Sequence, residues 1–208
     1  MTGAPTRSDT PASTPPSNPS ETFEHAKHWG DLFLRESAKE SDRAAVIVAT
    51  SIFDNTLLSL LKQHLVPNPS SDDELFDGTN APLTSFSAKI AMAHRLGLIS
   101  GAFARNLHLI RRIRNEFAHN IHGGSFQDSS VKNRVLELYK SQKYKNDYKG
   151  KDWHPEGPRG EFLIVCVWML WSLNAEVAST KPLGEADLEF GFRDTEPSDP
   201  SAERTSKG

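Results

Sequence analysis

Apolar residues recur at helical spacing along most of this chain of 208 residues, and this pattern is the strongest constraint on its fold. No stretch alternates polar and apolar residues between hairpin turns, so no β-strand is predicted. Helices are predicted at about residues 22–38, 41–66, 84–96, 101–120, 128–138 and 160–178. Because most of the links are short, we predict an all-α fold, a single bundle of about six helices.

Residues at the ends of these segments set the predicted boundaries. The predicted N-caps are Ser41, Thr84 or Ser85, Ser100 and Asp128. Pro67 prevents the second helix from continuing, and Gly97 suits the left-handed position that follows a helix.

Proline-rich polar segments flank the predicted helices. Eight of the thirteen prolines lie in residues 1–20 and 181–208, where apolar side chains are too few to offset the entropy of ordering the chain. We therefore predict a disordered N-terminal tail at 1–20, one helical domain at 21–180 and a disordered acidic C-terminal tail at 181–208. Residues 1–20 lack an apolar core, so no secretory signal is expected there.

One cysteine and one short apolar run restrict the class of protein further. Cys166 is the only cysteine, which excludes disulfide frameworks and cysteine-rich zinc sites and favours a cytoplasmic location. The longest apolar run, Phe162 to Trp171, has ten residues, about half the length that a membrane-spanning helix needs. We expect this run to form a buried helix with Cys166 as an inert core residue. We expect no membrane partner, no metal and no cofactor.

Basic residues are concentrated in the middle of the chain. Although the net charge is −3, segment 100–151 has eleven Lys and Arg against four Asp and Glu. Segment 21–99 has seven bases against eleven acids, and segment 152–180 has one against four. The basic middle segment indicates a surface that attracts anionic groups.

The sharpest motif is Arg114-Asn115, followed by His119, on the predicted helix at 101–120. Arg114 falls among apolar residues of this helix, and a buried guanidinium must find acceptors or open onto a pocket. The chemistry that this motif would support is metal-independent RNA cleavage, in which Arg114 holds the phosphate, His119 moves a proton and Asn115 orients one of them. His119 lies about 140° further round the helix, so the pair converges only if the helix end bends or a second subunit contributes. The alternative is structural: Arg114 and Asn115 hydrogen-bond loops to the helix, and His119 lies near its C-terminal dipole.

A second candidate site is the connection at 139–151, which contains five lysines and three tyrosines. Lysines attract phosphate and tyrosines can stack on unpaired bases, so the connection is predicted to bind nucleic acid. The predicted binding residues are Lys140, Lys143, Tyr144, Lys145, Tyr148, Lys149 and Lys151. Residues that would extend the site are Arg111, Arg112, Lys132 and Arg134. The alternative is a solvated loop whose tyrosines pack on the bundle.

Other polar residues carry weaker signals. Asp54 and Asn55 lie near the apolar face of the second helix, where internal hydrogen bonds are expected. His25 and His28 lack a third metal ligand at fixed spacing. No helix-turn-helix recognition unit is evident.

Several motifs between about Glu36 and Phe126 resemble the mannitol operon repressor (MltR) family. They are DELFDGTNAPL (73–83), SFSAKI (85–90), LGLI (96–99) and LIRRIRNEFAH (109–119). The resemblance implies an all-helical cytoplasmic bacterial protein that regulates transcription, as a repressor of sugar-alcohol uptake genes. It implies no known DNA-reading element, so a protein partner is expected.

The Arg114-Asn115-x-x-x-His119 pattern also resembles the arginine-x4-histidine motif of HEPN domains, helical modules that include metal-independent ribonucleases. This resemblance implies catalytic Arg114 and His119, supported by Asn115, in a site formed across a dimer. The first hypothesis is therefore a homodimeric regulator that acts through a protein partner. The alternatives are a HEPN-type endoribonuclease and a noncatalytic RNA-binding module, with RNA or DNA as the nucleic-acid partner.

Overall fold

A computed structural model describes residues 33–35, 37, 39–120, 124–141 and 157–186. Within these ranges the chain contains no β-strand, which confirms the predicted all-α fold. The helices are α2 (Asp42–His64), α3 (Phe86–Arg95), α4 (Gly101–His119), α5 (Ser129–Lys140) and α6 (Gly157–Ser179). Further helical residues at 33–35, 37 and 39 belong to the first predicted helix; residues 22–32 of that helix lie outside the described residues.

Serine caps begin three helices where the sequence predicts them. The side chains of Ser41, Ser85 and Ser100 each accept a hydrogen bond from the backbone N–H three residues later, at 3.1–3.2 Å. Gly97 follows α3 with a φ of +76°, a conformation that side chains with a Cβ rarely adopt. Local residues therefore set these helix ends, as predicted.

The start of α6 differs from the prediction by one turn. The sequence pattern places Pro158 in the connection before the helix, with the helix beginning at about Gly160. In the structure α6 begins at Gly157, and Pro158 lies in its first turn. Proline is tolerated there because backbone N–H groups in the first turn have no helical acceptor.

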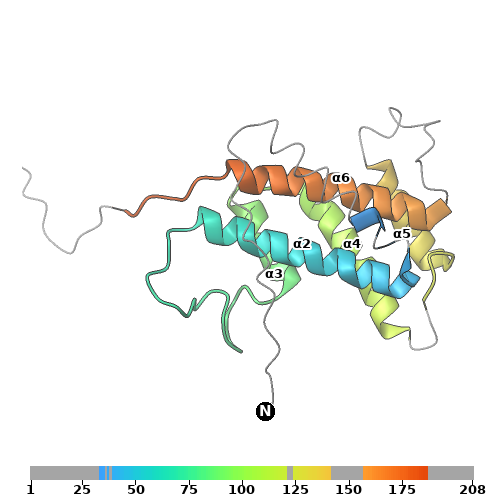
Figure 1. The fold of residues 1–208 in the computed structure, drawn as a ribbon, viewed down its shortest axis with the longest axis horizontal. Helices are drawn as coiled ribbons and strands as arrows, with labels where there is room; N and C mark the ends of the chain where they lie inside the picture. Colours follow the sequence, from blue (N-terminus) through green and yellow to red (C-terminus); the bar gives the residue numbers. More distant parts are fainter. Residues whose placement is uncertain (1–32, 36, 38, 121–123, 142–156, 187–208) are drawn as a thin grey trace, which may run out of the picture.

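α2 and α6 lie side by side and run in the same direction (Figure 1). Arg159 pairs with Asp42 at the start of the two helices, and His64 contacts the backbone oxygen of Lys181 at their ends. Both contacts join residues 117 apart, so the two 23-residue helices stay in register over their length. The backbone N–H of Leu183 also donates to His64 O at 2.7 Å. The described chain thus continues past residue 180, the predicted end of the domain, and residues 187–208 lie outside the described part.

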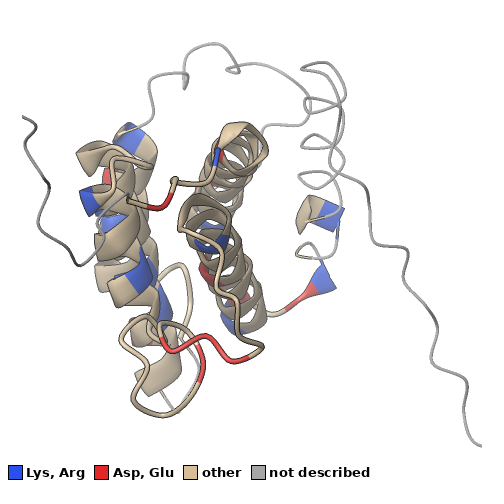
Figure 2. Cartoon of the chain, turned by 90° about the vertical axis from the view of Figure 1, so that its left-hand side faces the viewer, with Lys and Arg blue, Asp and Glu red and all other residues tan. Residues whose placement is uncertain are grey.

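α4 is the central helix of the second layer and packs against α2, α3 and α5. It runs antiparallel to α2, because Arg43 at the start of α2 donates to the backbone oxygen of Ala118 at the end of α4, at 3.1 Å. It also runs antiparallel to α5, because Arg105 near its start pairs with Glu137 near the end of α5, at 2.5 Å. Figures 1 and 2 show α3, α4 and α5 on one side of the α2–α6 pair.

The link between α4 and α5 requires a glycine at its described end. A Cβ on Gly124 would lie 2.8 Å from Phe117 Cδ1, closer than real Cβ contacts. Phe117 is the first of three packed rings, with Phe126 at 5.3 Å and Phe162 of α6 at 5.2 Å from Phe126. Asp128 precedes α5 as predicted, but its carboxylate accepts from a backbone N–H in this link instead of capping the helix.

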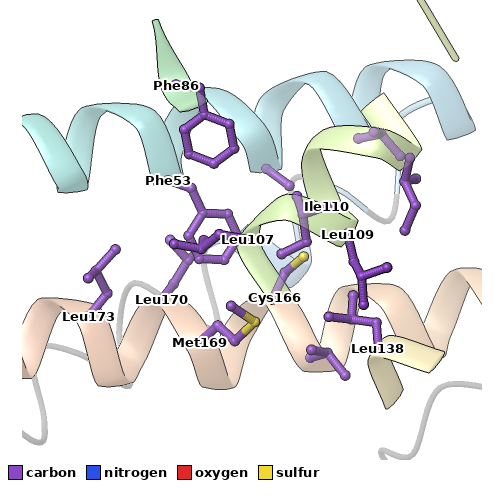
Figure 3. Packing of buried hydrophobic residues seen from close by; sticks show 14 of the residues in the cluster. Phe53, Phe86, Leu107, Leu109, Ile110, Leu138, Cys166, Met169, Leu170 and Leu173 are labelled. Atoms are coloured by element: carbon purple, nitrogen blue, oxygen red, sulfur yellow. The ribbon is translucent and has the colours of Figure 1, made fainter. Parts of the chain in front are cut away.

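The core lies between the two layers. Figure 3 shows Phe53 of α2 beside Leu107 of α4 and Leu170 of α6. α2 and α6 are long and apolar enough to cross a membrane by length and composition, a test that core helices of bundles also pass. Eight residues of α2 and nine of α6 are buried in this bundle. The run from Phe162 to Trp171 is mostly buried, as predicted.

Candidate functional site

Arg114 and His119 lie on different sides of α4. The helix is continuous from Gly101 to His119, so the five-residue separation corresponds to a rotation of about 140°. Arg114 is half-buried, whereas His119 is exposed. A single described chain therefore does not bring the predicted catalytic pair together, and the convergence would have to come from a second subunit.

The side chains of Arg114 and Asn115 make no hydrogen bond or ion pair with any residue in the described ranges. The apolar residues around them behave as predicted, since Leu107, Ile110 and Phe117 are fully buried. Arg114 lies at the edge of this buried stripe and is partly open to solvent. Within the described part of the chain, the hydrogen bonds to loops that the structural interpretation requires are not observed.

Two polar atoms on α4, within two turns before Arg114, also lack hydrogen-bond partners among the described residues. Arg111 Nε and His108 Nδ1 are buried without a hydrogen-bond partner among the described residues. Burial lowers the pKa of His108, and the positive charges of Arg111 and Arg112 lower it further. Burial is the larger cause, and the two arginines add a positive charge beside this imidazole.

Most of the predicted nucleic-acid site lies outside the described residues. The predicted binding residues outside the described ranges are Lys143, Tyr144, Lys145, Tyr148, Lys149 and Lys151. Lys140 is exposed at the end of α5, and Tyr139 packs against the core. Arg134, predicted to extend the site, instead pairs with Glu116 at 2.8 Å, so an acid already offsets its charge.

The starts of α2 and α6 meet in a polar junction that the sequence analysis does not predict. Asp42 accepts hydrogen bonds from Arg159, from the backbone N–H of Phe126 at 3.1 Å and from Ser125 Oγ at 3.4 Å. Arg159 also donates to two backbone oxygens before α2, at 2.7 Å each. A signal existed in the sequence, because Arg159 is the one base in segment 152–180 and lies three residues before the apolar run.

Asp54 forms the internal hydrogen bond that the sequence predicts. Lys89 Nζ donates to Asp54 Oδ1 at 2.7 Å and to the backbone oxygen of Thr84 at 3.3 Å. The Lys89 side chain is only 7% exposed, so its charge depends on this pairing. The contact ties α3 to α2 and gives Asp54 a structural role.

The C-terminal end of α2 borders a hollow of about 610 Å³, lined by residues between Lys62 and Phe76. Lys62 Nζ lies 5.3 Å from the centroid of the Phe76 ring and 4.0 Å from Asp77 Oδ2. Three acids of the following loop also line the hollow. They are Asp72, Asp73 and Glu74.

Exposed apolar side chains gather at this end of the bundle. Of the six large apolar side chains exposed in the described residues, Val66, Leu75 and Leu183 lie here, and the first two line the hollow. We call the hollow and these three side chains the apolar rim. The sequence analysis missed the rim, although its loop contains the DELFDGTNAPL motif.

No group of three or more His, Cys, Asp or Glu side chains able to hold a metal occurs within the described ranges. Cys166 is fully buried, and burial raises the pKa of its thiol well above the ordinary value. The thiolate is therefore disfavoured, as expected for a cysteine that serves as an apolar core residue.

No protein-family model matches the chain, and no curated protein matches it. Among solved structures, it is similar to a chain in the X-ray structure of the MtlR–HPr complex from Escherichia coli. The identity is 17%, the TM-score is 0.49, and the match covers 73% of this chain and 99% of that chain.

Proposed function

We propose that this protein is a cytoplasmic transcriptional regulator that acts as a helical interaction module through a protein partner. Its resemblance to the mannitol operon repressor family makes sugar-alcohol uptake genes the proposed target. The observation that carries the proposal is the apolar rim. Exposed apolar side chains gathered around a hollow are typical of surfaces that bind other proteins.

Part of the rim lies in a segment that resembles the family. Leu75, which is 39% exposed, belongs to the DELFDGTNAPL motif. Fully burying a leucine is worth about 1.5–3 kcal/mol, and a partner that covers the exposed part of Leu75 would recover a fraction of this energy. Asp72, Asp73 and Glu74 add negative charge beside it, so the proposed partner surface is apolar and basic.

The packing of α4 favours a partner over direct DNA reading. α4 is the most basic described helix, but it packs against three other helices and has seven buried residues. A recognition helix must present successive side chains to base edges in the major groove. In this proposal the partner recognises the operator, while this chain, as a homodimer, controls the partner.

Two variants test the rim in cells that lack the native gene. Leu75→Asp is expected to abolish regulation of the sugar-alcohol uptake transcripts, because a charge there opposes docking on an apolar surface. Leu136→Asp on α5 is the matched control, since Leu136 is 40% exposed but lies away from the rim. Circular dichroism must show both variants folded. Unchanged transcripts in the Leu75→Asp strain would contradict the proposal.

A metal-independent endoribonuclease is the second candidate, supported by the half-buried Arg114 with no acceptor in the described residues. His119 from a second chain would complete the site, with Asn115 in support. Purified protein should then cleave single-stranded RNA in the presence of a chelator, leaving 2′,3′-cyclic phosphate ends. Mixing Arg114→Ala and His119→Ala chains should restore part of the activity, because a mixed dimer holds one intact composite site. Absence of cleavage by the wild-type dimer would eliminate this candidate.

A further inference from the structure

The acids of helices α2 to α5 are all engaged in ion pairs, and this pattern leaves a group of arginines without a counter-charge. The four pairs are Asp42–Arg159, Asp54–Lys89, Glu116–Arg134 and Glu137–Arg105. α3 contains no acid. On α4 this leaves Arg111, Arg112 and Arg114 with no acid partner among the described residues.

Arg111 and Arg114 lie on one face of α4, and Arg43 at the start of α2 contacts the C-terminal end of this helix. Arg111, Arg114 and Ala118 are spaced i, i+3 and i+7, so they lie on one face of the helix. The backbone oxygen of Ala118 accepts the hydrogen bond from Arg43 of α2. Arg43 therefore approaches α4 one turn beyond Arg114. It uses one of its five N–H donors in this bond.

Because these guanidinium groups are partly buried, they need hydrogen-bond acceptors more than exposed surface charges do. Arg111 and Arg114 are half-buried, and Arg111 Nε is buried with no partner in the described ranges. A buried donor without an acceptor is unfavourable, and more so when it is charged. The potential extends to His108, one turn earlier, whose pKa is lowered by burial and by Arg111 and Arg112.

We propose that Arg111 and Arg114 of α4, with Arg43 of α2, form a binding site for the phosphate group of an anionic ligand. Planar guanidinium groups bind phosphate oxygens through paired, charge-assisted hydrogen bonds. The phosphate supplies the acceptors and the counter-charge that the described residues do not supply. We call this group the arginine seam; it does not include His119, which lies on another side of α4.

The arginine seam is separate from the apolar rim. Arg43 and Lys62 are near opposite ends of α2, roughly 28 Å apart along the helix at about 1.5 Å per residue. The seam therefore goes beyond the proposed function: a phosphate-bearing effector could bind here while a protein binds at the rim. The ligand chemistry fits either a small phosphorylated molecule or the backbone of RNA.

The test is titration of the full-length protein with pyrophosphate at constant ionic strength, followed by the NMR signal of the His108 imidazole. Bound phosphate should raise the pKa of His108, because it offsets the charges of Arg111 and Arg112. The double variant Arg111→Gln, Arg114→Gln should bind pyrophosphate at least about tenfold more weakly. Arg95→Gln is the matched control, because Arg95 is an exposed arginine on α3 and should leave the affinity unchanged.

Circular dichroism checks that the variants fold. The double variant Arg111→Lys, Arg114→Lys provides a second comparison. It keeps both charges but loses the paired hydrogen bonds, so an intermediate affinity supports the seam. Displacement of pyrophosphate by short single-stranded RNA at lower concentration would identify RNA as the source of the phosphate. Failure of RNA to displace it would exclude RNA and leave a small phosphorylated molecule as the source. Equal weakening by Arg95→Gln, or no change of the His108 pKa, would overturn the proposal.

Discussion

The α2–α6 pair carries four acids and three bases, whereas the α4–α5 pair carries two acids and seven bases. Figure 2 shows Lys and Arg spread over the layer that contains α4 and α5. The two pairs also differ in how their helices are linked along the chain. α4 and α5 are neighbours in sequence and antiparallel, while α2 and α6 are parallel and joined by contacts between residues 117 apart.

This difference indicates a division of roles between the two layers. A parallel pair without a short link needs fixed contacts at its ends, and α2 and α6 have the Asp42–Arg159 junction at one end and the His64 contacts at the other. A short link already holds α4 against α5, so their surface charges are less constrained by folding. The excess of arginine on α4 is therefore the feature for which folding contacts in the described residues account least.

The largest effect should come from the core beneath the α2–α6 layer. Phe53→Ala removes a fully buried ring from α2 and should lower the free energy of unfolding by about 3–5 kcal/mol. Leu136→Ala on the exposed side of α5 should change it by less than about 0.5 kcal/mol. Urea denaturation measures both. Similar losses in the two variants would show that the core does not lie between the layers.

The second effect tests the polar junction against a surface ion pair. Asp42→Ala removes the carboxylate that pairs with Arg159 and accepts from the Phe126 N–H, and should cost about 2–3 kcal/mol. Glu137→Ala breaks the exposed pair with Arg105, at a cost within about 1 kcal/mol. If Glu137→Ala were as destabilising as Asp42→Ala, α4 and α5 would depend on ion pairs as much as α2 and α6 do.

A third prediction concerns the short link between α4 and α5. Gly124→Ala places a Cβ 2.8 Å from the Phe117 ring and should cost about 1–2 kcal/mol, because the ring packs against Phe126 and cannot move freely. Gly184→Ala is the control, since nothing lies within 4 Å of its Cβ. Thermal unfolding of both variants gives the comparison. Equal melting temperatures would mean that the link adapts without cost.

The smallest effect is the pH dependence of the basic layer. Folding lowers the pKa of His108 below its ordinary value of 6.5, so near that pH the unfolded chain binds more protons than the folded chain. Stability contributed by neutral His108 is therefore lost as the pH falls. Between about pH 7.5 and about pH 5.5, the melting temperature of the wild type should fall more than that of His108→Gln. Equal falls would show that neither burial nor the charges of Arg111 and Arg112 lower the pKa of His108.

Much of the fold could be predicted because helix signals are local. Ser41, Ser85 and Ser100 bond to backbone groups three residues away, so their roles can be inferred from neighbouring residues. Pro158 shows the limit of such inference, because the first turn of a helix accepts proline as readily as a loop does. Only the packing of α6 on α2 distinguishes the two.

The sequence predicts some residues of the candidate site, but it does not predict how they are placed in space. Arg114 was identified from its position among apolar residues, yet helix periodicity alone does not reveal that it is only half-buried. The apolar rim was missed because Leu75 and Leu183 are far apart in sequence and look like ordinary apolar residues. Asp42 and Arg159 were missed for a similar reason, since their contact depends on two helices in parallel register.

The sequence by itself determined the helical class, three N-caps, the glycine after α3 and the buried stripe of α4. These features depend on interactions within about four residues, which backbone geometry fixes. The tertiary structure alone decided which charges are neutralised, because ion pairs join residues 32, 35 and 117 apart. Arg134 and Arg114 lie in the same basic segment, but Arg134 pairs with Glu116, whereas Arg114 has no acid partner among the described residues.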